Sequence, residues 1–240
     1  MIVSLLQSGL SGKEMVLHLL CMLFAITISF SFHEFMHARV AVWLGDQTPA
    51  NMGRLTLNPM AHMDPVGTVL ILVAGFGWGK PVMYNPNRLN RFKSDRAMNI
   101  MVHLAGVTGN LIIALLASVV LGCISAVLTV NNHIAFQTIL LVMLYTISFS
   151  LMLLAFNLLP IPPLDGFHVL DELLPYKVRS SQWYLQFQRY SPMALWVLFL
   201  AGTFMRIPLL SWIIEVIEYP FSLLCGLVQT LFFNLVNMLV

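Results

Sequence analysis

Two histidines and a glutamate stand at metal-site spacing in one stretch of the chain. His33-Glu34-Phe35-Met36-His37 reads H-E-x-x-H. In a helix, residues four apart lie on the same face, so both imidazoles can reach one metal ion. The glutamate between them lies beside the metal and can take a proton from a metal-bound water. The spacing therefore predicts a hydrolytic zinc site, with His33 and His37 as ligands and Glu34 as the catalytic base.

The motif lies in the second half of a long apolar run, residues 15–45. An ionisable side chain inside a membrane span costs about 2.5–3.5 kcal/mol on insertion scales, so such groups are candidates for function. In a water-exposed helix, His and Glu are common surface residues, and the same pattern carries less information. In lipid, three unpaired ionisable groups would carry a desolvation cost with nothing to offset it. The setting therefore favours a metal site over a chance pattern.

A catalytic zinc site needs a third protein ligand and leaves its fourth position to water. Asp165 is the candidate, because it follows the third apolar run and a Pro-rich break that can turn the chain back toward the site. At about 1.5 Å per residue, His33, His37 and the end of the third run fall in the same half of the membrane. The alternative is that Asp165, which precedes Gly166, only forms a turn. His168 is then the next candidate, as a ligand or as a group that orients one.

Composition identifies the solvent around these residues as lipid. Hydrophobic residues make up 59% of the 240 residues and charged residues 9%. A soluble domain is typically about 45–50% apolar and about 25% charged. With 12 Lys and Arg against 10 Asp and Glu, no basic face could follow the phosphates of a nucleic acid. These numbers exclude an ordinary soluble enzyme, a disordered protein and a nucleic-acid-binding protein.

Long apolar runs predict an all-α integral membrane protein, a polytopic bundle of about four to six transmembrane helices. The runs cover 15–45, 97–130, 133–159, a segment from about Ser191 that Arg206 and Pro208 interrupt, and 221–240. We expect a single membrane-embedded metalloprotease domain over residues 1–240, with its core at about 15–205. The C-terminal apolar helix, 219–240, either spans the membrane or lies along its surface.

The stretch of about fifty residues between the first two spans is rich in Gly, Pro, Asn and Asp, which interrupt helices. Two short pieces, 54–57 and 81–84, are typical of β-strands. The apolar segment 66–76 is too short to span a membrane and predicts a re-entrant or interfacial segment. Such a segment is covered by protein or lines a wet cavity.

Positive charge predicts the orientation of the spans. Most Lys and Arg residues fall in two loops, 46–96 and 160–190, which share one side of the membrane because two spans separate them. Basic loops are usually cytoplasmic. We therefore expect a multi-pass protein of the plasma membrane whose active site lies toward the cytoplasm.

Longer stretches around these residues resemble the site-2 protease family of intramembrane metalloproteases, peptidase family M50. The H-E-x-x-H motif, Leu-Asp-Gly at 164–166 and Asn157 carry the resemblance. The stretches 53–68 and 77–82 are similar to the branch without a PDZ domain, and the whole resemblance covers about residues 20–205. It implies zinc held by both histidines of the motif and by the aspartate of Leu-Asp-Gly, with the glutamate of the motif as the catalytic residue.

The second span departs from the family pattern at one position. Where the family carries Gly-Pro-x-x-Asn, this chain has Gly106-Val107-Thr108-Gly109-Asn110. Without the proline the helix could be locally straighter, which affects how Asn110 is aimed. We expect Asn110 and Asn157 to donate hydrogen bonds to the substrate backbone. The competing interpretation for both is hydrogen bonding between helices, which is common for Asn in membrane spans.

The expected function is intramembrane proteolysis of another protein's transmembrane helix, and the resemblance implies regulated intramembrane proteolysis. A helix must unwind to expose a peptide bond, and the strand-like pieces could pair with the unwound segment. The alternative is a non-proteolytic membrane protein, either a metal transporter or a pseudoprotease. A transporter would need ionisable groups along several spans, and a pseudoprotease would be expected to lack Glu34 or a ligand. The sequence leaves the oligomeric state open.

Overall fold

The computed structural model describes residues 9–74, 77–128, 134–204 and 209–239. Within these ranges the chain is helical, which confirms the predicted all-α class. The elements are α2 (Gly12–Leu44), α3 (Thr48–Asn51), α4 (Pro59–His62), α5 (Pro65–Ala74), the 3-10 turn η1 (Pro86–Arg88), α6 (Asp95–Leu128), α7 (Ile134–Asn157), α8 (Asp165–Leu173), α9 (Tyr176–Arg179), α10 (Gln182–Phe204) and α11 (Leu209–Asn237).

Among the described helices, four are long and apolar enough to cross a membrane: α2, α6, α7 and α11. This number lies at the lower end of the predicted range. The span expected from about Ser191 corresponds to α10, which begins at Gln182 and is not one of the four. Its expected interruption at Arg206 and Pro208 lies outside the described residues.

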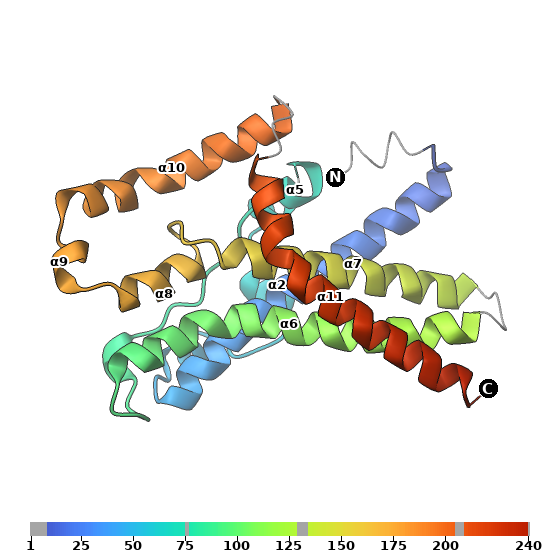
Figure 1. Ribbon diagram of the computed structural model, residues 1–240, viewed down its shortest axis with the longest axis horizontal. Helices are drawn as coiled ribbons and strands as arrows, with labels where there is room; N and C mark the ends of the chain where they lie inside the picture. The colour runs from blue at the N-terminus through green and yellow to red at the C-terminus, as the bar shows by residue number, and fades with distance from the viewer. Residues whose placement is uncertain (1–8, 75–76, 129–133, 205–208, 240) are drawn as a thin grey trace.

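Helices α2, α6 and α7 pack on one another, and α11 crosses α6 and α7 (Figure 1). Small residues on α6 allow this crossing. Ala114 packs with Leu151 of α7 and Cys225 of α11, and a Cβ on Gly122 would collide with the Gln229 carbonyl. Small residues let membrane helices approach closely. Helix α11 is long and apolar enough to span a membrane, and its position across or along the membrane stays a prediction.

Helix α2, which carries the H-E-x-x-H motif, has limits set by its terminal residues. Ser11 and Glu14 form a capping box, in which Glu14 accepts the Ser11 N–H at 2.9 Å and its own N–H bonds the Ser11 hydroxyl. At the other end, Gly45 has φ +121°, and a Cβ there would overlap Asn90 Oδ1 and lie 3.0 Å from Asn90 Cγ. The Asn90 N–H donates to the Leu44 carbonyl at 2.9 Å. The loop before α6 is thereby tied to the end of α2.

The two predicted strand pieces, 54–57 and 81–84, are irregular, so the prediction of short strands was wrong. Among the described residues, β pairing is limited to one isolated bridge between Met63 and Gly79. In both pieces, a backbone group that could pair with a neighbouring strand bonds to a side chain instead. The Thr56 carbonyl accepts from His62, and the Val82 N–H donates to the Glu34 carboxylate of α2. The segment 81–84 is therefore held by the helix bundle instead of by a neighbouring strand.

The apolar segment predicted to be re-entrant forms the short helix α5 as far as it is described. Its ten residues extend for about 15 Å, which is too short to cross a membrane. Asp64 caps α5, since its Oδ1 accepts the N–H groups of Val66 and Gly67 at 3.0 Å. A Cβ on Gly67 would lie 2.8 Å from the Trp78 carbonyl carbon, so the returning chain packs directly on α5. Entry of this helix into the membrane stays a prediction.

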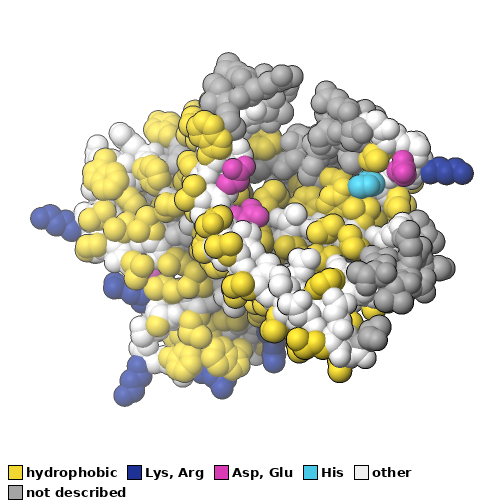
Figure 2. All heavy atoms as spheres, turned by 45° about the vertical axis from the view of Figure 1, so that its right-hand side comes forward, with side chains coloured by type: hydrophobic (Ala, Val, Ile, Leu, Met, Phe, Trp, Pro, Cys, Tyr) yellow, Lys and Arg dark blue, Asp and Glu magenta, His cyan; other side chains and the backbone are white. Residues whose placement is uncertain are grey.

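Figure 2 shows hydrophobic side chains spread over the described part of one face, with most of the visible Lys and Arg side chains toward one side of the molecule. Large apolar residues of α11 are exposed, among them Val216 at 75% and Leu227 at 69%. Exposed apolar surface of this extent suits a chain whose solvent is lipid.

Candidate metal centre

Three side chains from two helices meet at one point. The Nε2 atoms of His33 and His37 are 3.1 Å apart. Asp165 Oδ2 lies 3.3 Å from each of them. The structure thus brings together the three residues predicted as ligands, and they form its one group of potential metal-binding side chains within the described ranges. Both imidazoles are buried, with His33 5% and His37 8% exposed.

The start of α8 explains how Asp165 reaches the histidines of α2. Asp165 is the first residue of α8 and follows the extended residue Leu164. A Cβ on Gly166 would lie 2.5 Å from the Leu158 carbonyl carbon, so the glycine lets α8 begin directly against the end of α7. Gly166 therefore allows α8 to lie close to the end of α7. As the first residue of α8, Asp165 directs its carboxylate toward the histidines of α2.

The hydrogen bond of His37 leaves its Nε2 lone pair free for a cation, and the bond of His33 does the same when the Asn110 side-chain amide is turned over. The His37 Nδ1 lies 2.7 Å from the Val102 carbonyl, an acceptor, so this nitrogen carries the proton. The His33 Nδ1 lies 3.1 Å from the Asn110 amide, whose Oδ1 is buried without a hydrogen bond. Turning that amide would let Oδ1 accept from His33 Nδ1–H, with the same result for His33.

The carboxylate of the cluster also lacks a hydrogen-bonding partner. Asp165 Oδ2 is buried and makes no hydrogen bond, although two imidazole nitrogens lie 3.3 Å away. Two imidazole nitrogens and one carboxylate are a donor set that zinc uses in hydrolytic sites. The residues present therefore fit a zinc ion.

Helix α6 leaves room for the imidazoles at one residue. A Cβ on Gly106 would overlap His37 Nε2 and would lie 2.6 Å from His33 Nε2. Any side chain at this position would fill the space in front of the two nitrogens. Gly106 therefore keeps the ligand atoms accessible.

Glu34 is 8% exposed and lies beside the cluster on α2. Its Oε2 accepts the Val82 N–H at 3.1 Å. This bond connects the proposed base to the irregular segment between α5 and α6. The hydrogen bond fixes the direction of the Glu34 carboxylate beside the cluster.

The two predicted asparagines have different positions. Asn110 is fully buried and reaches His33, although α6 has Val107 where the family has proline and runs unbroken over Asp95–Leu128. Asn157 donates to the Leu153 carbonyl within α7 at 2.9 Å. Among the described residues, no hydrogen bond joins Asn157 to the cluster.

The other histidine considered as a ligand, His168, lies outside the cluster. Its ring stacks on His103 of α6, with centroids 4.7 Å apart and planes at 15°. Both residues belong to a neighbouring polar cluster described below.

Sequence reasoning missed three groups of the site. The Val102 carbonyl and the Val82 N–H are backbone groups, and their side chains give no signal. For Gly106 the sequence does hold a signal. Asn99, His103, Gly106 and Asn110 follow one another at spacings of four, three and four residues. These spacings place small and polar residues on one face of a helix.

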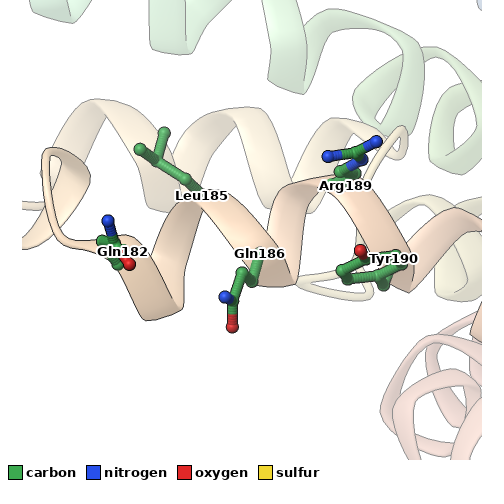
Figure 3. Close-up of a pocket in the computed structure, with 5 residues that line it drawn as sticks. All are labelled: Gln182, Leu185, Gln186, Arg189 and Tyr190. Carbon is green, nitrogen blue, oxygen red and sulfur yellow. The ribbon is translucent and has the colours of Figure 1, made fainter.

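A surface pocket with a volume of about 290 Å³ lies along α10. Figure 3 shows its lining side chains on successive turns of this helix: Gln182, Leu185, Gln186, Arg189 and Tyr190. None of the predicted site residues lines it, so this pocket is separate from the metal centre.

Fold and site together define a helical membrane protein with a buried centre suited to a metal ion. The family model described as peptidase family M50 matches residues 65–202. A Bacillus subtilis protein named "Putative zinc metalloprotease YwhC" is 40% identical over 189 residues, which cover 78% of this chain and 84% of that protein. A Mycobacterium tuberculosis protein named "Putative zinc metalloprotease Rip2" is 30% identical over 205 residues, which cover 82% and 71%. No solved structure matches the chain.

The chain belongs to peptidase family M50, a membrane-embedded family.

Proposed function

We propose that this protein is an intramembrane zinc metalloendopeptidase that hydrolyses peptide bonds in transmembrane helices of other membrane proteins. The observation that carries the proposal is the convergence of His33, His37 and Asp165 next to Glu34, inside a bundle of apolar helices. Both relatives carry the name "Putative zinc metalloprotease", which supports zinc as the metal. Every residue that hydrolysis needs is present, which argues against a pseudoprotease.

Zn²⁺ held by the two imidazoles and the carboxylate would act as a Lewis acid and lower the pKa of water bound to it. Glu34 then takes a proton from the attacking water and passes it to the leaving amine. The Val82 N–H holds the Glu34 carboxylate in one orientation through its 3.1 Å hydrogen bond. The Val102 carbonyl and Asn110 keep the two ligand imidazoles in the required tautomer and direction.

For Asn110, the contact with His33 supports an orienting role in place of the expected substrate contact. For Asn157, we keep the proposed hydrogen bond to the substrate backbone. Its amide nitrogen carries two hydrogens, and the bond to the Leu153 carbonyl uses one of them.

The substrate helix must unwind before its peptide carbonyl can be attacked, and its freed backbone groups then need partners. Residue 83 offers them: the backbone N–H and C=O of Met83 have no hydrogen bond among the described residues, and the side chain is 59% exposed. We propose that an unwound substrate segment pairs with this edge by strand addition, although the edge itself is not part of a sheet.

The single domain is proposed to lie in the plasma membrane, with regulated proteolysis of a membrane-bound protein as its role. Aromatic residues next to basic residues support a cytoplasmic membrane interface around α9 and the start of α10. These exposed aromatics are Tyr176, Trp183 and Tyr190. The ligands gather at one depth of the bundle, which supports a catalytic site over a transport path.

The experiment that tests the proposal is reconstitution of the purified protein with a library of single-span transmembrane peptides, with products identified by mass spectrometry. The wild type is compared with Glu34→Gln and with a chelator-treated sample. We expect cuts within the spans for the wild type, none for Glu34→Gln, and recovery after zinc is returned to the chelated protein. Equal cleavage by Glu34→Gln would contradict the role of the base.

A further inference from the structure

A second polar cluster lies beside the metal centre and has no part in the chemistry proposed above. We call it the Tyr84 cluster, and its members are Tyr84, Asn99, His103, His168 and Glu172. Three parts of the chain contribute to it: the segment before η1, helix α6 and helix α8. The same three parts carry Val82, Gly106 and Asp165.

The hydrogen bonds of the Tyr84 cluster form one directed chain. The Tyr84 hydroxyl lies 2.9 Å from His103 Nε2 and 3.4 Å from Asn99 Oδ1. The Asn99 amide nitrogen donates to Glu172 Oε1 at 2.9 Å. All these contacts are satisfied when His103 Nε2–H donates to the phenol oxygen and the phenol donates to Asn99. The chain then ends on a carboxylate, which strengthens the bonds before it.

Tyr84 remains a phenol in this setting. Burial raises its pKa above the ordinary value for tyrosine, and the nearby carboxylates of Glu172 and Asp165 raise it further. The hydroxyl proton needed for the bond to Asn99 is therefore retained.

Tyr84 is two residues from Val82, whose N–H bonds the Glu34 carboxylate. In the part of the chain that the structure describes, no strand pairs with residues 81–84.

The backbone of the segment is held at both ends. The Lys80 N–H donates to the His62 carbonyl at 2.7 Å, and the Asn85 N–H donates to Asp46 Oδ2 at 2.6 Å. Between these two bonds, the described hydrogen bonds of the segment are that of the Val82 N–H to Glu34 and those of the Tyr84 hydroxyl to α6. When the hydroxyl is lost, Tyr84 keeps its ring contact with His103 and its packing on the core around Leu44 and Met98, but it loses the hydrogen bonds of its side chain.

We propose that Tyr84 is a positioning residue for the proposed base: its hydroxyl, held by His103 and Asn99, keeps the Val82 N–H on Glu34. The inference rests on the proposed function and deepens it. Among the described residues the Tyr84 hydroxyl bonds to His103 and Asn99 and to none of the three predicted ligands, so Tyr84 acts through Val82.

The test uses Tyr84→Phe, which removes the hydroxyl and keeps the ring. The matched control is Tyr176→Phe on α9, because Tyr176 is 79% exposed and makes no side-chain hydrogen bond. A neutral hydrogen bond shifts an equilibrium by about two- to tenfold. We expect Tyr84→Phe to lower kcat by about that factor, with unchanged KM and zinc content, and the control to match the wild type.

Two further readouts separate positioning from a general loss of structure. Hydrogen exchange of the zinc-free protein should be about two- to tenfold faster at the Val82 amide in Tyr84→Phe. In a Val82→Pro background, which lacks that N–H, Tyr84→Phe should have little additional effect on kcat. Three results would each overturn the proposal. In the double variant, the effects of the two substitutions on kcat could multiply in full. In Tyr84→Phe, exchange at the Val82 amide could be unchanged, or the zinc content could fall in parallel with kcat.

The wild type and Glu34→Gln are measured in the same series. A wild type without cleavage would mean that the proposed function is wrong. A different result would overturn only the role of Tyr84: the wild type is active, Glu34→Gln is inactive, and Tyr84→Phe is as active as the wild type.

Discussion

Gly106 of α6 lies so close to His37 of α2 that a Cβ at this position would overlap the Nε2 atom of the imidazole. The same Cβ would lie 2.6 Å from His33 Nε2. The absence of a side chain on one helix therefore leaves the space that two ligands on another helix need. This relationship connects the second span directly to the metal centre.

Gly106→Ala is expected to weaken zinc binding by about tenfold or more, since the methyl group forces the imidazoles to move and overpacking of this kind costs about 1–3 kcal/mol. The zinc affinity of the purified variant, measured by competition with a chelating dye, checks this. Gly226→Ala on α11 is the matched control, because nothing lies within 4 Å of a Cβ there. Normal zinc affinity in Gly106→Ala would contradict the described packing.

Asn110→Ala and Asn157→Ala should affect different steps. Removal of a group that orients a ligand typically lowers metal affinity or activity by about 10–100-fold, so we expect weaker zinc binding for Asn110→Ala. Asn157 contacts its own helix instead of the cluster, so Asn157→Ala should leave zinc affinity unchanged and raise KM. Equal zinc affinities of the two variants would argue against an orienting role for Asn110.

Proline substitutions at two neighbouring residues should separate catalysis from substrate pairing. Val82→Pro removes the N–H that bonds Glu34, and we expect a lower kcat. Met83→Pro removes an N–H that has no partner among the described residues, and we expect a higher KM with unchanged kcat. Zinc content should remain normal in both variants. The assay is steady-state cleavage in proteoliposomes, and an unchanged KM in Met83→Pro would count against strand addition.

Sequence reasoning located the catalytic motif because H-E-x-x-H depends on residues four apart in one helix, which is a local property. The juxtaposition with Asp165 could be anticipated from the order of spans and from the family resemblance. The prediction of short strands at 54–57 and 81–84 was wrong. In the first piece the Arg54 N–H donates to the Pro49 carbonyl, and the Thr56 carbonyl accepts from His62. In the second piece the Val82 N–H donates to a side chain that is distant in sequence. No local pattern encodes such bonds, as the contact between Val82 and Glu34 illustrates.

The predicted start of the last helix shows a second limit of prediction from the sequence. Hydropathy identified α2, α6 and α7 because each is a continuous apolar run. The C-terminal helix was expected to begin near residue 219, yet α11 begins at Leu209. Glu215 and Glu218 lie in its first turns, and charged residues reduce the hydropathy there without ending the helix.

Asp46 should make the stability of the protein depend on pH. It accepts the Thr48 N–H at 3.0 Å, the Thr48 hydroxyl at 2.6 Å and the Asn85 N–H at 2.6 Å. Burial raises the pKa of Asp46, but these hydrogen bonds lower it more, so its pKa in the folded protein lies below the ordinary value of 3.8. Its stabilising effect is therefore complete above the ordinary pKa and is lost as the pH falls through the lower, folded-state value.

Asp46→Asn is accordingly expected to lower the Tm by about 2–6 °C at pH 7. The difference from the wild type should shrink in acid, as the wild-type carboxylate becomes protonated. Thermal unfolding in detergent at pH 7, 5 and 3 measures this. A Tm difference that stays constant over this range would show that the charge of Asp46 is not the stabilising feature.

The most direct test of the central claim is the zinc content of detergent-purified protein by elemental analysis, with the wild type beside His33→Ala and Asp165→Ala. A three-ligand site predicts about one zinc per chain in the wild type and loss or marked weakening in both variants. Retention of zinc by Asp165→Ala, or a wild type that binds no zinc at all, would contradict the account.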